Sequence, residues 1–182
     1  MSKKNLICGL LVVLATSIFG QDTFTLSSTD LGGQALKLQE FNGFGCTGEN
    51  VSPQLSWSNA PEGTKSYAIT MYDPDAPTGS GWWHWLVFDI PTTVNEIASN
   101  AGNIELYLMP KEAKQSITDY GTMGYGGPCP PEGHGLHQYI ITIHALKTAT
   151  LGLDENTNAA VVGYYLSNTT LAKASIVAYY ER

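Results

Sequence analysis

The sequence predicts a mainly β domain, a β-sandwich or barrel that carries a few short helices. Glycine (19 residues) and proline (9 residues) divide the chain into short apolar runs, which is typical of strands joined by turns. Six of these runs are predicted to be strands, whereas only one segment is predicted to be a well-defined helix. No repeat, low-complexity tract or linker interrupts residues 21–182, so we expect a single domain.

The expected elements follow the chain in order. The strands are short runs rich in apolar, β-branched and aromatic residues, and they cover 23–28, 54–57, 67–73, 84–90, 137–146 and 175–180. The helix covers 158–166, after the acidic pair Asp154-Glu155. Segments 97–102 and 111–116 are expected to form helical turns. Many strands with few helices favour a sandwich or barrel.

Residues 1–20 have the pattern of a secretory signal peptide. Lys3 and Lys4 form a basic start, residues 6–19 form an apolar run, and the small residue Gly20 precedes Gln21. The run is shorter than the roughly 20 residues that span a bilayer. We expect cleavage after Gly20 and export of residues 21–182 to the periplasm or the extracellular space, with no transmembrane anchor. A retained anchor and a buried N-terminal strand or helix are the alternatives.

The charge balance argues against two classes of function. The formal net charge is −7, and removal of Lys3 and Lys4 leaves 7 basic against 16 acidic side chains, or −9. A domain of this sign is a poor ligand for nucleic acid or for anionic membrane surfaces. The single arginine, Arg182, ends the sequence. An anion would therefore have to be held by His, Lys, hydroxyl groups or backbone N–H groups.

Two cysteines remain once Cys8 is lost with the signal peptide. Only one pairing exists between Cys46 and Cys129, and an oxidising compartment favours a disulfide. Two separate buried thiols are the alternative. Neither cysteine belongs to a C-x-x-C motif, so a zinc or redox site is not indicated.

Three of the expected strands carry an ionisable residue at one end of an apolar face. Alternate residues share a face, and the sets are Tyr67, Ile69, Met71 and Asp73; His84, Leu86, Phe88 and Ile90; and His137, Tyr139, Ile141 and Ile143. If the first two strands pair antiparallel and the third runs parallel to the second, Asp73, His84 and His137 reach one end of the sheet. Tyr139 lies beside them.

The loops at this end favour a rigid pocket mouth. Residues 73–77 contain Pro74 and Pro77, residues 126–131 pair glycines with prolines that include Pro130, and Trp82 follows the first loop. An aspartate that faces two histidines should favour protonated imidazoles. Such imidazoles can donate N–H groups to a phosphate or a carboxylate.

Other readings of these residues remain open. Both loops could be plain turns, with the histidines satisfied in the core. Asp73, His84 and His137 could form a two-His-one-carboxylate metal site, and Ser80 near His84 could form a nucleophile–base pair. Neither pattern is favoured, so we expect no metal and no cofactor. His134, in a loop, and His144, on the opposite strand face, have no expected role.

The same residues resemble a known family. The motifs that carry the resemblance are 48–53 (Gly-Glu-Asn-Val-Ser-Pro), 73–77 (Asp-Pro-Asp-Ala-Pro), 82–85 (Trp-Trp-His-Trp), 130–133 (Pro-Pro-Glu-Gly) and 135–139 (Gly-Leu-His-Gln-Tyr). Together they resemble phosphatidylethanolamine-binding proteins, in particular the bacterial Raf-kinase-inhibitor-like branch, over nearly all of residues 23–181. The resemblance implies an antiparallel β-sandwich with Greek-key connections and a few peripheral short helices.

The resemblance also implies a small anion pocket. Its positions here are Asp73, Pro74, Trp82, His84, His137 and Tyr139, and Cys129 falls where eukaryotic members have a pocket-lining glycine. Gln138 replaces an arginine found in many members and points away from the His137 face, which puts partner contacts through that arginine in doubt.

The first functional expectation is a secreted, non-enzymatic protein that binds phosphate, a phosphorylated head group or a carboxylate. The alternative is an inhibitor of a protease or of a kinase pathway that uses the pocket as a docking site. An esterase or a metal-dependent hydrolase is the third candidate.

Overall fold

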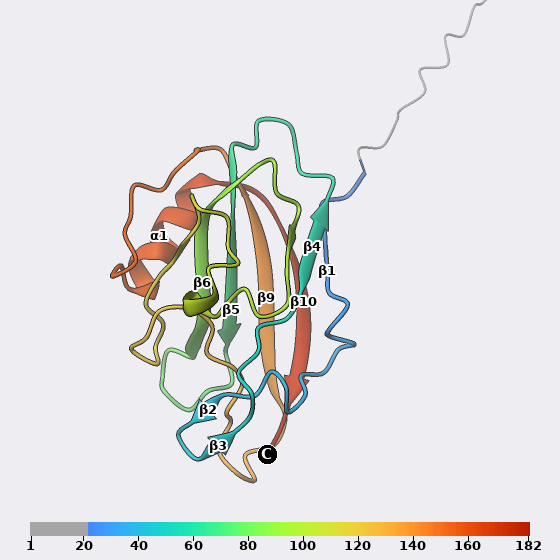
Figure 1. Cartoon of the computed structure of the whole chain (residues 1–182), viewed down its shortest axis with the longest axis vertical. Coiled ribbons are helices and arrows are strands. Elements are labelled where there is room, and N and C mark those ends of the chain that lie inside the picture. The colour runs from blue at the N-terminus through green and yellow to red at the C-terminus, as the bar shows by residue number, and fades with distance from the viewer. Residues whose placement is uncertain (1–21) are drawn as a thin grey trace, which may run out of the picture.

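A computed structural model describes residues 22–182, in which a five-stranded antiparallel sheet is the largest element (Figure 1). The expected signal peptide, residues 1–20, lies outside the described residues. Within residues 22–182, no helix is long and apolar enough to cross a membrane.

The order of strands in the large sheet is a Greek key. From one edge to the other the strands are β10 (Thr170–Tyr180), β9 (His137–Leu146), β5 (Ser66–Asp73), β6 (Trp82–Pro91) and β8 (Lys114–Gln115). Every neighbouring pair is antiparallel. A long connection leads from β8 to β9, and β9 lies beside β5 on the side away from β6. The resulting order β9, β5, β6 and β8 is that of a Greek key. The expected Greek-key architecture is confirmed.

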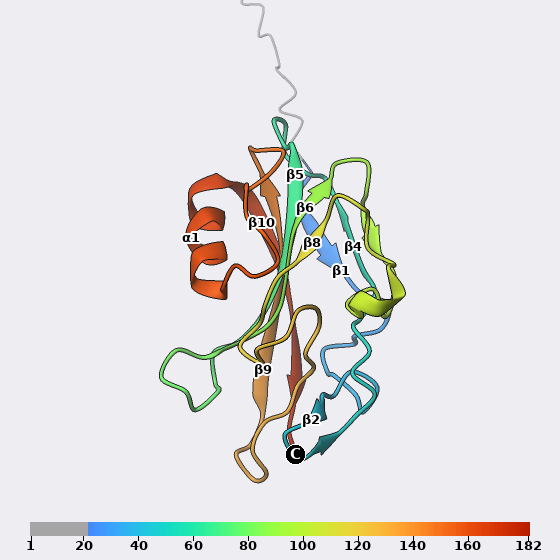
Figure 2. The ribbon, with the colours of Figure 1, turned by 60° about the vertical axis from the view of Figure 1, so that its left-hand side comes forward.

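A smaller sheet forms the second layer of the sandwich (Figure 2). It contains β1 (Thr25–Ser27), β4 (Leu55–Ser58) and β7 (Glu96–Ile97), again antiparallel. The main core lies between the two sheets, where Leu55 and Trp57 pack with side chains of the large sheet such as Ile69, Trp85 and Ile141. Strands β2 (Asn42–Gly43) and β3 (Cys46–Thr47) form a separate short hairpin.

The α-helix covers the other face of the large sheet (Figure 2). Helix α1 (Ala159–Thr169) begins after Asn158, whose side chain accepts a hydrogen bond from the backbone N–H of Val161. Val162 and Leu166 of α1 pack with Leu86 and Phe88 of β6 in a second cluster of buried residues. The expected helix is therefore present and extends three residues beyond the expected end.

The expected helical turns are wrong. Segment 97–102 contains the end of β7 and a turn, and segment 111–116 contains β8. The only 3-10 helix within the described residues, η1, lies between them at Ile104–Leu106. Two-residue strands such as β7 and β8 carry too few residues to show an alternation, so their pairing partners decide their conformation.

Strand β6 departs from the expected alternation. Leu86 and Phe88 pack toward α1, whereas Trp85, Val87 and Ile90 face the sandwich core, so the expected set His84, Leu86, Phe88 and Ile90 does not share one face. The register explains the difference because it shifts twice. Tyr67 pairs with Ile90 while Ile69 pairs with Val87, which separates Ile90 from the face of Leu86 and Phe88, and Met71 pairs with Trp85 while the next residue, Tyr72, pairs with Trp83. His84 is the extra residue of this β-bulge, and the bulge turns it to the side of the sheet on which Asp73 lies.

Candidate anion-binding pocket

A small cavity lies at the end of the large sheet where β5 ends and β6 and β9 begin. Because β6 and β9 both pair antiparallel with β5, they run in the same direction, as expected. The cavity has a volume of about 150 Å³ and is lined by Phe44, Asp73, Ala76, Pro77, Thr78, Trp82, His84, Tyr120, Cys129, Pro130, Pro131, His137 and Tyr139.

The structure brings together seven of the eight residues expected at the ligand site. Asp73, Trp82, His84, Cys129, Pro130, His137 and Tyr139 all line the cavity. Pro74 does not line it and is exposed in the loop after β5. Ser80 is also exposed and away from the lining.

Asp73 and His137 form a buried pair at the back of the cavity. His137 Nδ1 lies 2.7 Å from Asp73 Oδ2, and the two residues are 1% and 3% exposed. The other carboxylate oxygen, Oδ1, accepts a hydrogen bond from the backbone N–H of Asp75 at 2.8 Å. These contacts orient the carboxylate and the ring, and they satisfy a charge that is costly to bury alone.

His134 extends this pair to a chain of three side chains. Its Nδ1 lies 2.7 Å from His137 Nε2, so one ring donates a hydrogen bond to the other. No role was expected for His134. Its position in a Gly-His-Gly loop, three residues before His137, is the feature of the sequence that could have indicated this contact. Both ring nitrogens of His137 are thus occupied by protein groups.

His84 has a different environment. Its Nδ1 lies 2.8 Å from the carbonyl oxygen of Gly126 and 3.1 Å from that of Gly127. Burial lowers the pKa of His84 to about 4, although Asp73 and Asp119 act in the opposite direction. His84 is therefore neutral near pH 7, and the expectation of a protonated imidazole is wrong for this residue.

Aromatic side chains form the remaining walls. The rings of Tyr120 and Tyr139 contact His84 edge-on, with centroids 5.4 and 5.0 Å from its ring. The hydroxyl of Tyr139 and the indole Nε1 of Trp82 are buried and have no hydrogen-bond partner within residues 22–182. Burial and the Asp73 carboxylate raise the pKa of Tyr139 well above its usual range, so its hydroxyl keeps its proton. The indole N–H of Trp82 is available as a donor, and the hydroxyl of Tyr139 is available where a ligand oxygen competes with its neighbour, the Asp73 carboxylate.

Tyr120 and Phe44 were not expected at the site. Tyr120 donates its hydroxyl to the carbonyl oxygen of Gly127 at 2.9 Å, and its ring stacks on Phe41. Tyr120 lies in a turn after β8 and Phe44 in the turn between β2 and β3, where no alternation of the sequence marks a face. Their positions follow from long-range contacts that a local pattern does not contain.

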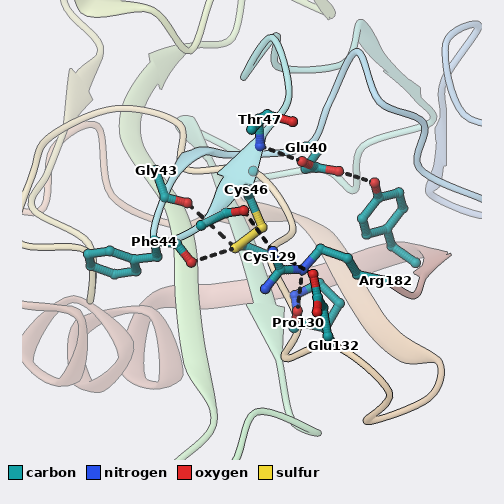
Figure 3. Close-up of a disulfide and its surroundings, with 12 residues drawn as sticks. Glu40, Gly43, Phe44, Cys46, Thr47, Cys129, Pro130, Glu132 and Arg182 are labelled. Atoms are coloured by element: carbon teal, nitrogen blue, oxygen red, sulfur yellow. Dashed lines mark hydrogen bonds and ion pairs between the residues drawn. A yellow bond between two sulfur atoms is a disulfide. The ribbon is translucent and has the colours of Figure 1, made fainter.

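A disulfide closes the wall formed by the loops (Figure 3). Cys46 and Cys129 are bonded, with 6.0 Å between their Cα atoms and a sequence separation of 83. Beside the bond, Arg182 Nη1 donates to the carbonyl oxygen of Gly45 at 2.8 Å, and its Nε donates to that of Pro130 at 3.1 Å. Arg182 thus ties both cysteine-bearing loops together behind the cavity.

Comparison with known proteins assigns the family. Residues 27–181 match the family described as phosphatidylethanolamine-binding protein. The chain belongs to the phosphatidylethanolamine-binding protein family. The UPF0098 protein YbcL of Escherichia coli (strain K12) is 44% identical over 180 residues, which are 98% of each chain. UPF0098 protein YbhB of the same organism is 46% identical over 141 residues, or 78% of this chain and 88% of that protein.

A solved structure supports the fold of this phosphatidylethanolamine-binding protein family member. The crystal structure of E. coli YbcL, described as a new member of the mammalian PEBP family, superposes with a TM-score of 0.85 at 46% identity. The superposition covers 87% of this chain and 98% of that one.

Proposed function

We propose that this protein is an exported, non-enzymatic module that binds a small anion in the pocket at the end of the large sheet. The ligand classes are phosphate, a phosphorylated head group and a carboxylate. Six buried side-chain polar atoms within residues 22–182 have no hydrogen-bond partner, and the observation that carries the proposal is that two of them line this one cavity, the hydroxyl of Tyr139 and the indole N–H of Trp82. Unpartnered buried polar groups are uncommon in folded proteins, and two of them beside one cavity favour a ligand that supplies the acceptor.

The size of the cavity supports a small ligand group. A volume of about 150 Å³ lies below the roughly 300–1,000 Å³ of sites for drug-sized molecules. It suits a phosphate or carboxylate group, with any larger portion of the ligand outside the mouth. No arginine lines the cavity, so we expect weak binding of free phosphate, with a Kd of about 1 mM, or about 4 kcal/mol.

The environment of the candidate nucleophile supports a binding role over hydrolysis. Ser80 is exposed and outside the cavity, and His84 Nδ1 is hydrogen bonded to two backbone carbonyl groups. A nucleophile–base pair requires the two side chains within hydrogen-bond reach.

Export is part of the proposal. It is supported by the basic, apolar and small-residue pattern of residues 1–20 and by the bonded pair Cys46–Cys129, because disulfides persist in oxidising compartments.

Tyr139→Phe provides the sharpest test of the binding role. We expect phosphate affinity to fall about tenfold, consistent with the roughly 1.5 kcal/mol of one charge-assisted hydrogen bond. The fold should be little affected, because the polar neighbour of the hydroxyl, the Asp73 carboxylate, keeps its hydrogen bonds with His137 and Asp75. The measurement is a phosphate titration followed by the imidazole NMR signals of His84 and His137. His144 lies on the opposite face of the sheet in a separate cavity, so its signals provide the internal control. Unchanged signals of His84 and His137 at saturating phosphate would place the ligand elsewhere.

The rim of the cavity supports a second candidate, an inhibitor of a protease or of a kinase pathway. Phe44 lines the mouth and is 71% exposed, a large apolar side chain that a protein partner could bury. Phe44→Ser should then abolish inhibition of that partner, and because Phe44 offers no polar group to the anion it should lower phosphate affinity less than Tyr139→Phe does. If inhibition is unchanged in this variant, the rim is not the docking surface.

A further inference from the structure

A second cavity lies between α1 and the outer face of the large sheet. Its volume is about 530 Å³, compared with about 150 Å³ for the anion pocket, and different residues line the two cavities. Strands β5, β9 and β10 supply its floor, and α1, which stands on this side of the sheet in Figure 2, supplies one wall. The volume is within the roughly 300–1,000 Å³ of sites for small organic molecules. We call it the helix-side cavity.

Gly163 of α1 leaves this cavity open. A Cβ atom on Gly163 would meet no heavy atom within 4 Å outside its own turn of the helix, and Gly163 has no positive φ. Neither close packing nor the backbone conformation therefore requires a glycine. Because glycine loses more backbone freedom on folding than alanine does, it destabilises the middle of a helix. The open space at Gly163 is thus not a requirement of the fold, and it leaves room for a ligand.

Apolar side chains supply much of the lining. Trp83 of β6 and Tyr72 of β5 lie with their ring centroids 4.5 Å apart, and Ile140 of β9 and Leu166 of α1 line the same space. Leu171 of β10 also lines the cavity and is 44% exposed. A ligand with a hydrocarbon portion would remove these apolar surfaces from water, which is favourable.

The fully charged group in the lining is basic. Lys173 of β10 lines the cavity and forms no ion pair within residues 22–182. No aspartate or glutamate of the described part of the chain lines the cavity, although the sequence has 16 acidic side chains. Lys173 pairs across the strands with His144, so the two side chains lie on the same face of the sheet. An anionic group on the ligand would complement this charge.

A threonine hydroxyl adds a hydrogen-bond donor. His144 Nδ1 lies 3.2 Å from Thr170 Oγ1, and His144 Nε2 lies 3.4 Å from Thr70 Oγ1. A neutral imidazole donates through one nitrogen and accepts through the other, so one of the two hydroxyls receives the proton of the ring and keeps its own. That O–H is free for another acceptor, since neither hydroxyl has a further hydrogen bond among the described residues. A protonated ring would free both hydroxyls, so a donor is present in either charge state.

We propose that the helix-side cavity is a second ligand site, which takes an amphipathic carboxylate. The hydrocarbon chain of the ligand lies against Trp83 and Leu166, and its carboxylate meets Lys173 and the free threonine hydroxyl. The site goes beyond the proposed function, and neither claim depends on the other. Inorganic phosphate has no hydrocarbon portion, so His144 remains a valid control in the phosphate titration.

The test is an NMR titration of the unmodified protein at pH 7 with hexanoate, octanoate, decanoate and octylammonium. The carboxylates should shift the imidazole signals of His144, and their affinity should rise about two- to fourfold for each added methylene. Octanoate should bind at least about fivefold more tightly than octylammonium. Because the negative net charge of the protein favours the ammonium, a preference for the carboxylate reports the groups in the cavity.

Saturating phosphate separates the two sites. Octanoate should still shift the His144 signals in its presence, because phosphate occupies the anion pocket. If octanoate shifts only His84 and His137 and phosphate displaces it, the inference fails while the proposed function stands. If octanoate shifts no histidine, or if octylammonium binds equally well, the inference also fails. Absence of any effect of phosphate on His84 and His137 would instead overturn the proposed function and leave this inference untouched.

Two pairs of variants locate the ligand. Gly163→Leu should fill the cavity and weaken octanoate binding at least about tenfold, whereas Gly163→Ala should leave most of the space and keep the affinity within about threefold. Both variants should fold, since leucine and alanine favour a helix more than glycine does. Lys173→Gln should bring the affinities for octanoate and octylammonium within about twofold of each other, whereas Lys111→Gln, outside the cavity, should keep the preference. Unchanged octanoate affinity in Gly163→Leu, or an unchanged preference in Lys173→Gln, would overturn the inference.

Discussion

Removal of the Cys46–Cys129 bond should destabilise the domain strongly while leaving its pocket assembled. The bond closes a loop of 83 positions, and the chain-entropy relation gives about 4.5 kcal/mol for a loop of this length. That free energy corresponds to roughly three powers of ten in the unfolding equilibrium constant. It acts by restricting the unfolded chain, so most native contacts should persist without it.

Several hydrogen bonds hold the two loops in the absence of the disulfide. The backbone N–H of Phe41 donates to the carbonyl oxygen of Pro128 at 3.0 Å, and that of Gly127 donates to Asn50 Oδ1 at 2.7 Å. Arg182 adds its bonds to Gly45 and Pro130. We therefore expect the variant with Cys46→Ala and Cys129→Ala to keep phosphate binding within about threefold, a change of less than 1 kcal/mol.

The assay is urea unfolding of the oxidised protein and of the double variant, followed by tryptophan fluorescence. The free energy of unfolding should fall by about 4–5 kcal/mol, and the dependence on urea should steepen because the unfolded chain expands. The same midpoint and slope for both proteins would refute the reasoning, since it requires the bond to constrain the unfolded state. Reduction of the unmodified protein by dithiothreitol is the control for effects of the alanines.

Three further predictions concern other parts of the chain. Protein recovered from outside the cytoplasm should have an intact mass that begins at Gln21, and a mass that includes residues 1–20 would contradict cleavage after Gly20. Burial lowers the pKa values of His84 and His144 from 6.5 to about 4. Between pH 6.5 and pH 4 these histidines therefore take up protons in the unfolded state but not in the folded state. Stability should thus be full above pH 6.5 and fall toward pH 4 by about 3 kcal/mol for each histidine, and His144→Gln should halve the fall in urea unfolding. Asn158→Ala removes the side-chain acceptor for the N–H of Val161 and should cost about 1 kcal/mol in thermal or urea unfolding, whereas an unchanged midpoint would contradict a capping role.

The sequence was most informative where strands are long and regular. The alternation in 67–73 and 137–146 placed Asp73, His137 and Tyr139 on the face where the structure has them. These strands pair over seven or more residues, so a single face is buried along their length and the pattern reflects it. The family resemblance then supplied the Greek-key order, which no local pattern encodes.

The sequence was least informative where the backbone is irregular. His84 lines the cavity, but the alternation used to place it there was wrong, because a bulge turns it toward Asp73. The loops that supply Tyr120, Phe44 and His134 have no periodicity, and their contacts span many residues. The protonation of His84 depends on burial among these loops, which is why the expectation of a charged ring failed.

The bulge at His84 connects the regular sheet to the irregular loop that closes the pocket. The extra residue in β6 adds nothing to the pairing of the sheet, since β5 advances by one residue where β6 advances by two. Its ring and its backbone carbonyl are instead bonded to the loop that closes the cavity, because Nδ1 contacts the carbonyl oxygens of Gly126 and Gly127 and the carbonyl oxygen accepts a hydrogen bond from the N–H of Gly126. The residue that the sheet does not need for pairing is thus the one that fastens the pocket loop to the sheet.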